Sequence, residues 1–287
     1  MPELPEVETV ARGLDTRVAG DSVESVWIGS KKQPLKSSAG VIAATLEGKR
    51  IVRVHRAGKH IVFDLDGEAR ASTRRSSHSK QGKRDARSAQ WIVHLGMTGR
   101  MVVCEPGAEI TKHTHLIATL ASGRELRFID PRMFGKLSVH LNDGGFDPGG
   151  VEPLEVSEEG FIALFRGRKT PIKSALLNQK LLRGVGNIYA DESLFRAGIR
   201  PRRRAAAITR EQLGRLHRAV REVLLEAIAL GGSSISDYVD ADGEEGFFQL
   251  QHRVYGREGE PCLVCGTGIR RVVLAGRSSH YCPKCQK

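Results

Sequence analysis

The 287-residue chain carries 45 lysines and arginines against 33 aspartates and glutamates, a formal net charge of +12, and 40% of its residues are hydrophobic. That length suggests two or three domains. The positive charge favours a polyanionic partner, most simply nucleic acid, although ribosomal and membrane-surface proteins share it. No apolar run approaches the roughly eighteen residues of a transmembrane helix, and no signal-peptide pattern opens the chain. We therefore expect a cytoplasmic protein with no membrane partner.

The first six residues, Met1-Pro2-Glu3-Leu4-Pro5-Glu6, contain groups suited to catalysis. Proline is small enough that we expect Met1 to be removed, which leaves Pro2 with a secondary amine, and α-amino groups titrate at about pH 8. A neutral amine of this kind attacks an aldehyde-like carbon. Glu3 is a candidate proton donor, and a first helical turn would bring Glu6 back to the same place.

A second interpretation of this stretch is ordinary helix-start chemistry. Proline at the first position and acidic residues in the first turn are common where a helix begins. An apolar stripe at helical spacing follows and predicts such a helix. The stripe consists of Val7, Val10, Ala11 and Leu14.

Short alternating apolar runs follow the first helix and predict strands. So many strands after one helix suggest a β-sandwich or barrel. The predicted strands are Ser25–Ile28, Ile51–His55, Ile61–Leu65, Trp91–Leu95, Met101–Cys104, His115–Leu120 and Glu125–Ile129.

The segment Glu68–Gln90 interrupts the strands with seven lysines and arginines against two acidic residues. It is rich in serine and lacks branched aliphatic residues, so it cannot bury enough surface to order itself. Hairpin loops are also usually only about two to five residues long. We expect a disordered insertion, which is either a tolerated solvated loop or an auxiliary DNA-binding arm.

Asn142–Gly150 is rich in Gly, Asp and Pro and predicts an interdomain linker. The chain then becomes helical, and its clearest helix runs from Thr209 to about Leu230, with a capping box formed by Thr209 and Gln212. Gly231-Gly232 ends it, and Ser233–Gln249 is expected to be a mobile loop. The remaining predicted helices are Glu158–Phe165, Ile172–Leu177 and Ala190–Ala197.

Four of the five cysteines lie within the last 26 residues, in two C-x2-C pairs. Thiolates at this spacing complete a closed tetrahedral shell, so we predict one structural Zn²⁺ that takes no part in catalysis. The fifth, Cys104, is expected to be a buried small hydrophobe. The predicted ligands are Cys262, Cys265, Cys282 and Cys285.

Between the cysteine pairs, Ile269–Leu274 and His280–Tyr281 predict the two strands of a zinc ribbon. Arg277 would lie on the turn between them, where its side chain is well placed to bind a phosphate. A second anion site is predicted at Gly184–Tyr189, because glycines before a helix expose backbone N–H groups. A tight helix–helix turn would look the same.

Two further motifs lie at strand ends, His94-Leu95-Gly96-Met97 and Asp130-Pro131-Arg132-Met133-Phe134. Met97, Arg132 and Phe134 could wedge into a base stack and fill the gap left by an extruded nucleotide, although each is also an ordinary packing residue. Lys59 follows Gly58 just before a strand. It could reach the site at the chain start, although a charge there is usually just solvated.

Together these motifs resemble bacterial formamidopyrimidine-DNA glycosylase, the base-excision repair enzyme for 8-oxoguanine and ring-opened purines. The likeness rests on Pro-Glu-Leu-Pro-Glu-Val-Glu, Gly58-Lys59, the two motifs above, Gly-Val-Gly-Asn-Ile-Tyr-Ala and the cysteine quartet, in that order. It implies an α+β multidomain fold. The domains would be an N-terminal β-sandwich with the first helix over residues 1–148, with its insertion at 68–90, a helix-two-turns-helix domain over 149–252, and a zinc finger over 253–287.

The resemblance also implies roles for individual residues. Pro2 would attack C1′ and form a Schiff base, Glu3 would protonate the sugar ring oxygen, and Glu6 would support the lesion pocket. Lys59 would contact phosphate and assist β-elimination, and Arg277 would assist δ-elimination. Met97, Arg132 and Phe134 would fill the vacated position in the duplex. The residues that would hold DNA phosphates are His94, His113, Arg168, Lys173 and Asn187.

The partner would then be damaged double-stranded DNA, bound by a monomer associated with the bacterial nucleoid. Two features depart from the family pattern: the 68–90 segment, and Met133, which stands where a second basic residue is usual. Endonuclease VIII, the relative that acts on oxidised pyrimidines, typically has glycine where this chain has Leu4, so we prefer the purine-lesion enzyme. A non-catalytic DNA-damage binder and a structural zinc-ribbon protein also remain open, and neither of them needs a free Pro2 amine.

Overall fold

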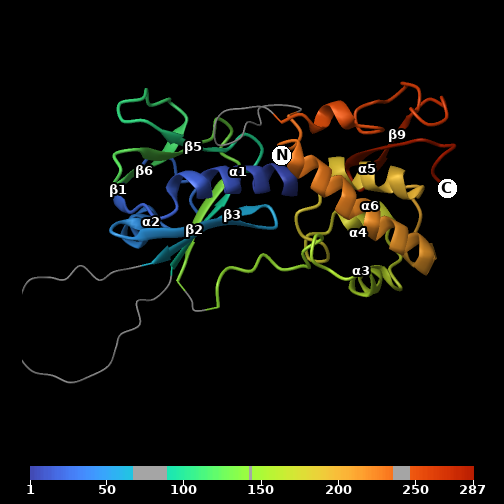
Figure 1. Ribbon diagram of the computed structural model, residues 1–287, viewed down its shortest axis with the longest axis horizontal. Helices are drawn as coiled ribbons and strands as arrows, with labels where there is room; N and C mark the ends of the chain where they lie inside the picture. Colours follow the sequence, from blue (N-terminus) through green and yellow to red (C-terminus); the bar gives the residue numbers. More distant parts are fainter. Residues whose placement is uncertain (67–88, 142–143, 235–245) are drawn as a thin grey trace, which may run out of the picture. The chain divides into compact units, whose positions relative to one another are not determined.

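The computed structural model describes residues 1–66, 89–141, 144–234 and 246–287. These residues form two compact units (Figure 1). The N-terminal unit contains Glu8–Asp147. The C-terminal unit contains Pro2–Val7 together with the described residues from Pro148 to Lys287. The first turn of the chain therefore belongs with the C-terminal half of the sequence.

Two four-stranded antiparallel sheets form the N-terminal β-sandwich. Their orders are β1-β6-β7-β5 and β2-β3-β4-β8. All seven predicted strands are present. The bounds are β1 Val23–Ile28, β2 Arg50–Ala57, β3 His60–Asp66, β4 Ala89–His94, β5 Arg100–Cys104, β6 Thr114–Leu120, β7 Glu125–Ile129 and β8 Lys136–His140.

Helix α1 spans Leu4–Val18, and every residue of the predicted apolar stripe is buried. Two elements were not predicted. One is α2, Ala39–Leu46, whose N-cap Ser38 accepts a hydrogen bond from Val41 N. Its buried residues Ile42, Thr45 and Leu46 lie at helical spacing, but Val41 and Ala44 on the exposed side are apolar as well, so the sequence shows no helical period. The other is β8, a short strand that completes one sheet by pairing with β4.

The C-terminal unit contains the helices α3 Glu158–Phe165, α4 Ile172–Leu176, α5 Asn187–Ala197 and α6 Arg210–Ala229 (Figure 1). The capping box at Thr209 is confirmed, with Gln212 N donating to the Thr209 hydroxyl and Thr209 N donating to Gln212 Oε1. Two 3₁₀ turns, η1 Ala205–Ala207 and η2 Phe248–Gln251, complete the unit. Its core includes Leu4, Phe161, Phe165, Leu176, Tyr189, Leu194, Leu216, Val220, Leu224 and Phe248.

The zinc-ribbon strands are β9 Arg270–Leu274 and β10 Arg277–Tyr281. Ala275 and Gly276, with φ of 47° and 75°, form the turn between them. Both residues in the left-handed region are typical of a two-residue type I′ hairpin. Arg277 therefore begins β10, paired with Leu274, and does not lie on the turn as predicted.

Two other expectations need adjustment. Cys104 is partly exposed at the end of β5, so the prediction that it is buried was wrong. Ala89 and Gln90 belong to β4, because Ala89 is buried and Gln90 donates to Asp64 Oδ1. The rest of the predicted insertion, and residues 235–245 of the predicted mobile loop, lie outside the described residues. Among the described helices, none is long and apolar enough to cross a membrane.

Candidate active site and nucleic-acid interface

The start of the chain is held against the Gly184-Val185-Gly186 turn. Leu4 N donates to Gly184 O at 3.0 Å, and the Leu4 side chain is fully buried. Gly184 has φ +88°, and a Cβ there would lie 2.8–3.1 Å from three atoms of the Leu4 side chain. Only glycine satisfies both the backbone conformation and the contact. The motif is therefore shaped to hold the first turn of α1.

The anion site predicted at the start of α5 is occupied by a carboxylate of the chain itself. Ile188 N donates to Glu3 Oε1 at 3.2 Å, and Glu3 is only 4% exposed. A Cβ on Gly186 would lie 2.2 Å from Glu3 Cδ, so no other residue fits there. Backbone N–H groups at a helix N-terminus favour negative charge. This arrangement fixes the carboxyl group of the residue that follows Pro2, and Pro2 is itself buried.

Glu6 joins three segments of the C-terminal unit. Its Oε1 accepts hydrogen bonds from the Tyr189 hydroxyl and from Ser233 N, and its Oε2 accepts one from Glu3 N at 2.7 Å. The side chain is 2% exposed, and burial raises the pKa of Glu6 although these hydrogen bonds oppose the shift. Glu6 therefore fixes the start of α1, helix α5 and the short segment that precedes residues 235–245.

A buried ion pair attaches β10 to the helices. Lys173 Nζ on α4 lies 2.7 Å from Asp191 Oδ1 on α5 and donates to Ser278 O at 2.6 Å. Asp191 Oδ2 accepts from His280 N at 2.9 Å. Asn187 Nδ2 also donates to the Ser278 hydroxyl at 3.3 Å. These contacts hold the residue next to Arg277, whose own side chain is exposed.

Tyr255 and Glu192 also shape this site, and sequence reasoning missed both. The carboxylate of Glu192, which is fully buried, accepts hydrogen bonds from the backbone N–H groups of Arg253, Val254 and Tyr255 at 2.9–3.1 Å. Burial raises the pKa of the Tyr255 hydroxyl, and the side chain of Asn187 opposes that shift. No spacing motif marks either residue, because they meet only in the folded chain.

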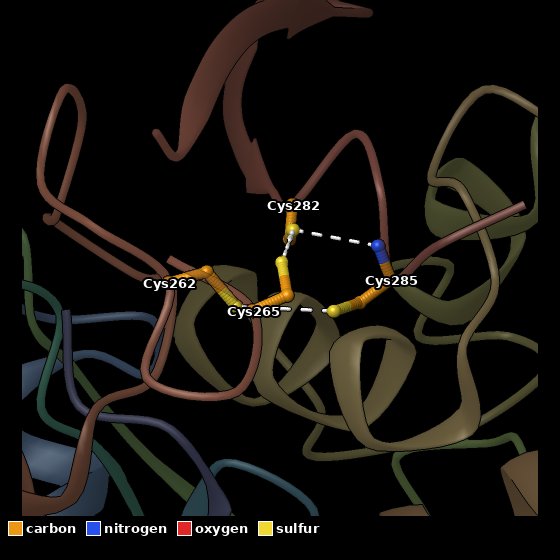
Figure 2. A group of neighbouring side chains, drawn as sticks. All are labelled: Cys262, Cys265, Cys282 and Cys285. Atoms are coloured by element: carbon orange, nitrogen blue, oxygen red, sulfur yellow. Dashed lines mark hydrogen bonds between the residues drawn. The ribbon is translucent and has the colours of Figure 1, made fainter. Parts of the chain in front are cut away.

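The four predicted zinc ligands converge at the base of the ribbon, where Figure 2 shows their sulfurs pointing toward one another. All four sulfurs lie within 4.8 Å of one another. The Sγ–Sγ distances are 3.5 Å for Cys265–Cys282 and 3.9 Å for Cys262–Cys285. Tetrahedral zinc with Zn–S bonds of about 2.3 Å places its sulfurs about 3.8 Å apart. The site therefore fits one structural Zn²⁺ with no open position.

The N-terminal unit contains the other predicted site residues. Lys59 lies in the turn between β2 and β3 and is only 8% exposed. His94 ends β4, and its Nδ1 accepts a hydrogen bond from Gly96 N at 3.1 Å. Burial, followed by the nearby charges of His60, Lys59 and Lys136, lowers the pKa of His94 to about 4. His94 is therefore neutral at pH 7, with its Nε2–H available as a donor.

Asp130 organises the loops that carry the predicted wedge residues. Its buried carboxylate accepts hydrogen bonds from the Thr98 hydroxyl at 2.6 Å and from Gly135 N at 2.7 Å. A Cβ on Gly96 would lie 2.5 Å from the backbone of the Phe134–Gly135 peptide, so the two loops touch. Asp130 N also donates to the backbone carbonyl of His113.

The side chains on these loops point into solvent. Met97 is 41% exposed and Phe134 is 50% exposed, and the guanidinium carbon of Arg132 lies 4.9 Å from the centre of the Phe134 ring. Exposed side chains of this kind, carried on loops that hydrogen bonds hold in place, are suited to insertion into a base stack. In the C-terminal unit, Arg168 is also exposed, just after α3.

The lowered pKa of His94 gives a prediction for the pH dependence of stability. The folded protein binds this proton near pH 4 and the unfolded chain near pH 6.5, so the free energy of unfolding should fall as pH drops through that window. The full effect is on the order of 3 kcal/mol. Urea unfolding at pH 7 and pH 4.5 should show a smaller loss for His94→Gln than for the parent. Equal losses in the two proteins would contradict the assignment.

Comparison with known proteins gives matches along almost the whole chain. Residues 1–137 match the formamidopyrimidine-DNA glycosylase N-terminal domain, residues 150–239 its H2TH domain, and residues 259–287 the zinc finger found in FPG and IleRS. The formamidopyrimidine-DNA glycosylase of Solibacter usitatus is 45% identical, with both chains fully covered.

Solved structures agree with the sequence matches. The MutM (FPG) protein of Thermus thermophilus superposes with a TM-score of 0.82 at 40% identity, covering 99% of this chain and 98% of that one. A Lactococcus lactis FPG mutant in complex with Fapy-dG-containing DNA gives a TM-score of 0.86 at 33% identity, with both chains fully covered.

Proposed function

The chain belongs to the formamidopyrimidine-DNA glycosylase family and is a DNA glycosylase of base excision repair, and we propose that it excises oxidised purines through a Schiff base at Pro2 followed by β,δ-elimination. The observation that carries this proposal is that Pro2 and the carboxyl-bearing residue that follows it, Glu3, are both buried. Glu3 is held by Ile188 N at the start of α5, one residue from the Pro2 nitrogen. The structure contains Met1, so removal of Met1 is required to free that nitrogen.

The reaction follows from an amine placed beside an acid. The Pro2 nitrogen bonds to C1′ of the damaged nucleotide as the glycosidic bond breaks, and the proton lost from that nitrogen neutralises the departing base. Glu3 gives a proton to the ring oxygen as the bond between that oxygen and C1′ breaks, which opens the sugar and leaves a cationic imine, the Schiff base. The imine acidifies the C2′ protons, so loss of one expels the 3′ phosphate, and a second elimination expels the 5′ phosphate.

Lys59 and Arg277 would steady the phosphate leaving groups of the β- and δ-steps, respectively. Met97, Arg132 and Phe134 would fill the gap left by the extruded nucleotide, whose unstacking costs a few kcal/mol. His94, His113, Arg168 and Asn187 would hold phosphates, and Glu6 would support the lesion pocket. Lys173, which was also predicted to hold a phosphate, is 1% exposed and paired with Asp191, so we propose that it holds β10 in place instead. The exposure of the wedge residues and of Arg277 supports these roles.

The substrate would be damaged duplex DNA, and the enzyme would act as a cytoplasmic, nucleoid-associated monomer. The proposed functional domains are residues 1–148, 149–252 and 253–287. The Zn²⁺ would be held by the four cysteines of the ribbon, and it would supply folding energy to the hairpin that carries Arg277, with no part in bond making.

Borohydride trapping on duplex containing 8-oxoguanine tests the mechanism, because it reduces the imine to a permanent protein–DNA adduct. The parent should be trapped, and Pro2→Gly should bind DNA but be trapped more slowly, since a primary amine replaces a constrained secondary one. A chain extended by one residue before Pro2 should give no adduct. Strand cleavage by the extended protein at the parental rate would rule out the N-terminal amine. An absence of adduct with the parent would favour a non-catalytic damage binder.

Oxidised pyrimidines are a second candidate substrate class. The Lactococcus lactis protein has been solved with DNA containing an abasic site and with DNA containing an oxidised pyrimidine. We propose that purine lesions are excised faster. Single-turnover rates on matched duplexes that differ only in the lesion would decide between the two classes.

A further inference from the structure

One stretch of the C-terminal unit is strongly basic, as is the 68–90 segment. Residues 160–210 contain twelve lysines and arginines and only two acidic residues, Asp191 and Glu192. Both acidic side chains are fully buried. This stretch therefore accounts for +10 of the net charge of +12. The exposed cations of residues 160–210 therefore have no exposed acidic residue within the same stretch of sequence.

The fold brings two basic parts of this stretch side by side. Ala206 N donates to Arg168 O at 2.8 Å, and Ala205 N donates to Thr170 O at 3.0 Å. An isolated antiparallel bridge joins Pro171 to Arg204. The segment that follows α3 thus runs along the segment that precedes η1. Cations separated by more than thirty residues in sequence share one surface as a result.

We name this surface the basic ledge and define it by five exposed side chains. Lys169 and Arg204 also line a hollow whose other lining residues are Ala206 and Ala207. The small alanine side chains leave the two cations open to a large ligand. The basic ledge consists of Arg166, Arg168, Lys169, Arg202 and Arg204.

Within the described part of the chain, none of the five ledge cations forms an ion pair. Other exposed arginines do: Arg12 pairs with Glu8, Arg215 with Glu211, and Arg218 with Glu158. Like charges held together without counter-charges repel one another and disfavour the compact state. A bound polyanion would remove that cost, and it would release its own condensed counterions.

We propose that the basic ledge binds phosphates of the DNA duplex outside the lesion site and adds non-specific affinity without taking part in excision. This goes beyond the proposed function, in which Lys169, Arg202 and Arg204 have no role. DNA fits better than a protein partner, because the hollow at Lys169 and Arg204 is lined by two long cationic side chains and two alanines. The lining of this hollow contains none of the aromatic or large aliphatic anchors on which protein interfaces depend.

The test compares two triple variants that each remove three positive charges. Lys169→Gln/Arg202→Gln/Arg204→Gln removes ledge cations, and Arg12→Gln/Arg215→Gln/Arg218→Gln removes cations already paired with carboxylates. Affinity for undamaged duplex is measured against salt concentration. The ledge variant should lose about tenfold or more in affinity, and its salt slope should become shallower by up to about 2.7, at about 0.9 per phosphate contact. The control variant should change the slope by less than one.

Two further measurements separate this proposal from the catalytic one. The single-turnover rate of excision, measured at a saturating concentration of the ledge variant, should match the parental rate within about twofold. The rate of borohydride trapping should match within the same range. If the salt slope changed equally in both variants, only the net charge of the protein would matter. If the salt slope of the ledge variant did not change, DNA would not bind the ledge, which would then bind an acidic protein or nothing. Either result overturns the proposal, as does a large loss of single-turnover rate. Failure of the parent to form an adduct would instead overturn the catalytic mechanism. The salt slopes of DNA binding would still test the ledge proposal in that case.

Discussion

Replacing Cys282 with serine should leave the protein without zinc and without measurable DNA binding. Cys282 is fully buried and belongs to a small apolar cluster with Phe195, Val254 and Ile269. That cluster is too small to hold the ribbon by itself, so metal binding supplies most of its folding energy. Structural zinc contributes roughly 10–16 kcal/mol in modules of this kind. Loss of the ribbon would release Arg277 and the Ser278 carbonyl that Lys173 contacts.

Zinc content by atomic absorption and affinity by fluorescence anisotropy would measure both effects. Cys104→Ser is the matched control, because it removes a thiol from the N-terminal unit, at a partly exposed position outside the quartet. It should keep about one zinc per chain and parental affinity. A metal-free Cys282→Ser protein that binds damaged duplex as tightly as the parent would show that the ribbon is not part of the DNA site.

Much of the fold could be predicted from sequence wherever a local pattern determines local structure. Helix α3 occupies the predicted range, and the Thr209 capping box places the start of α6 correctly. Helix α2 was missed because a run that is apolar on more than one side shows neither the helical nor the strand period. Arg277 was placed on the turn because the turn residues Ala275-Gly276 carry no strong hairpin signature apart from the glycine.

The candidate site likewise contains residues that a local sequence motif predicts and residues that only the tertiary structure reveals. The cysteine quartet and the glycine turn before α5 are spacing motifs, and both were recognised, although the anion held by that turn is Glu3 of the same chain. Glu192 could not be found, because its partners are backbone N–H groups about sixty residues further along the chain. Lys173 was predicted to hold phosphate, and its partner Asp191 was not considered. Only the tertiary structure shows that a carboxylate already faces that ammonium.

Lys173→Met should destabilise the protein by roughly 3–5 kcal/mol, because it leaves the Asp191 carboxylate buried without its partner. Lys173 is 1% exposed and Asp191 is fully buried, so little water can replace the lost charge. Burial lowers the pKa of Lys173, and the contact with Asp191 at 2.7 Å opposes that shift. The pair also holds Ser278 next to Arg277, so the variant should slow δ-elimination more than base excision.

The competing expectation is that Lys173 acts mainly as a phosphate contact. In that case Lys173→Met would keep parental stability, and the salt slope of DNA binding would become shallower by about 0.9. Urea unfolding and salt titration of the same variant therefore distinguish the two roles. Lys180→Met, an exposed lysine from the same stretch, is the matched control and should leave stability within about 0.5 kcal/mol of the parent.

A double variant shows whether the instability of Lys173→Met comes from the unpaired Asp191 carboxylate or from the loss of the lysine side chain itself. In Lys173→Met/Asp191→Leu both charges are gone, and apolar replacement of a buried ion pair is often neutral for stability. The double variant should therefore recover much of the stability lost by Lys173→Met. His280 N would still lose its acceptor, so the ratio of δ- to β-elimination products should stay low. Full recovery of both stability and product ratio would show that the ion pair does not position Arg277.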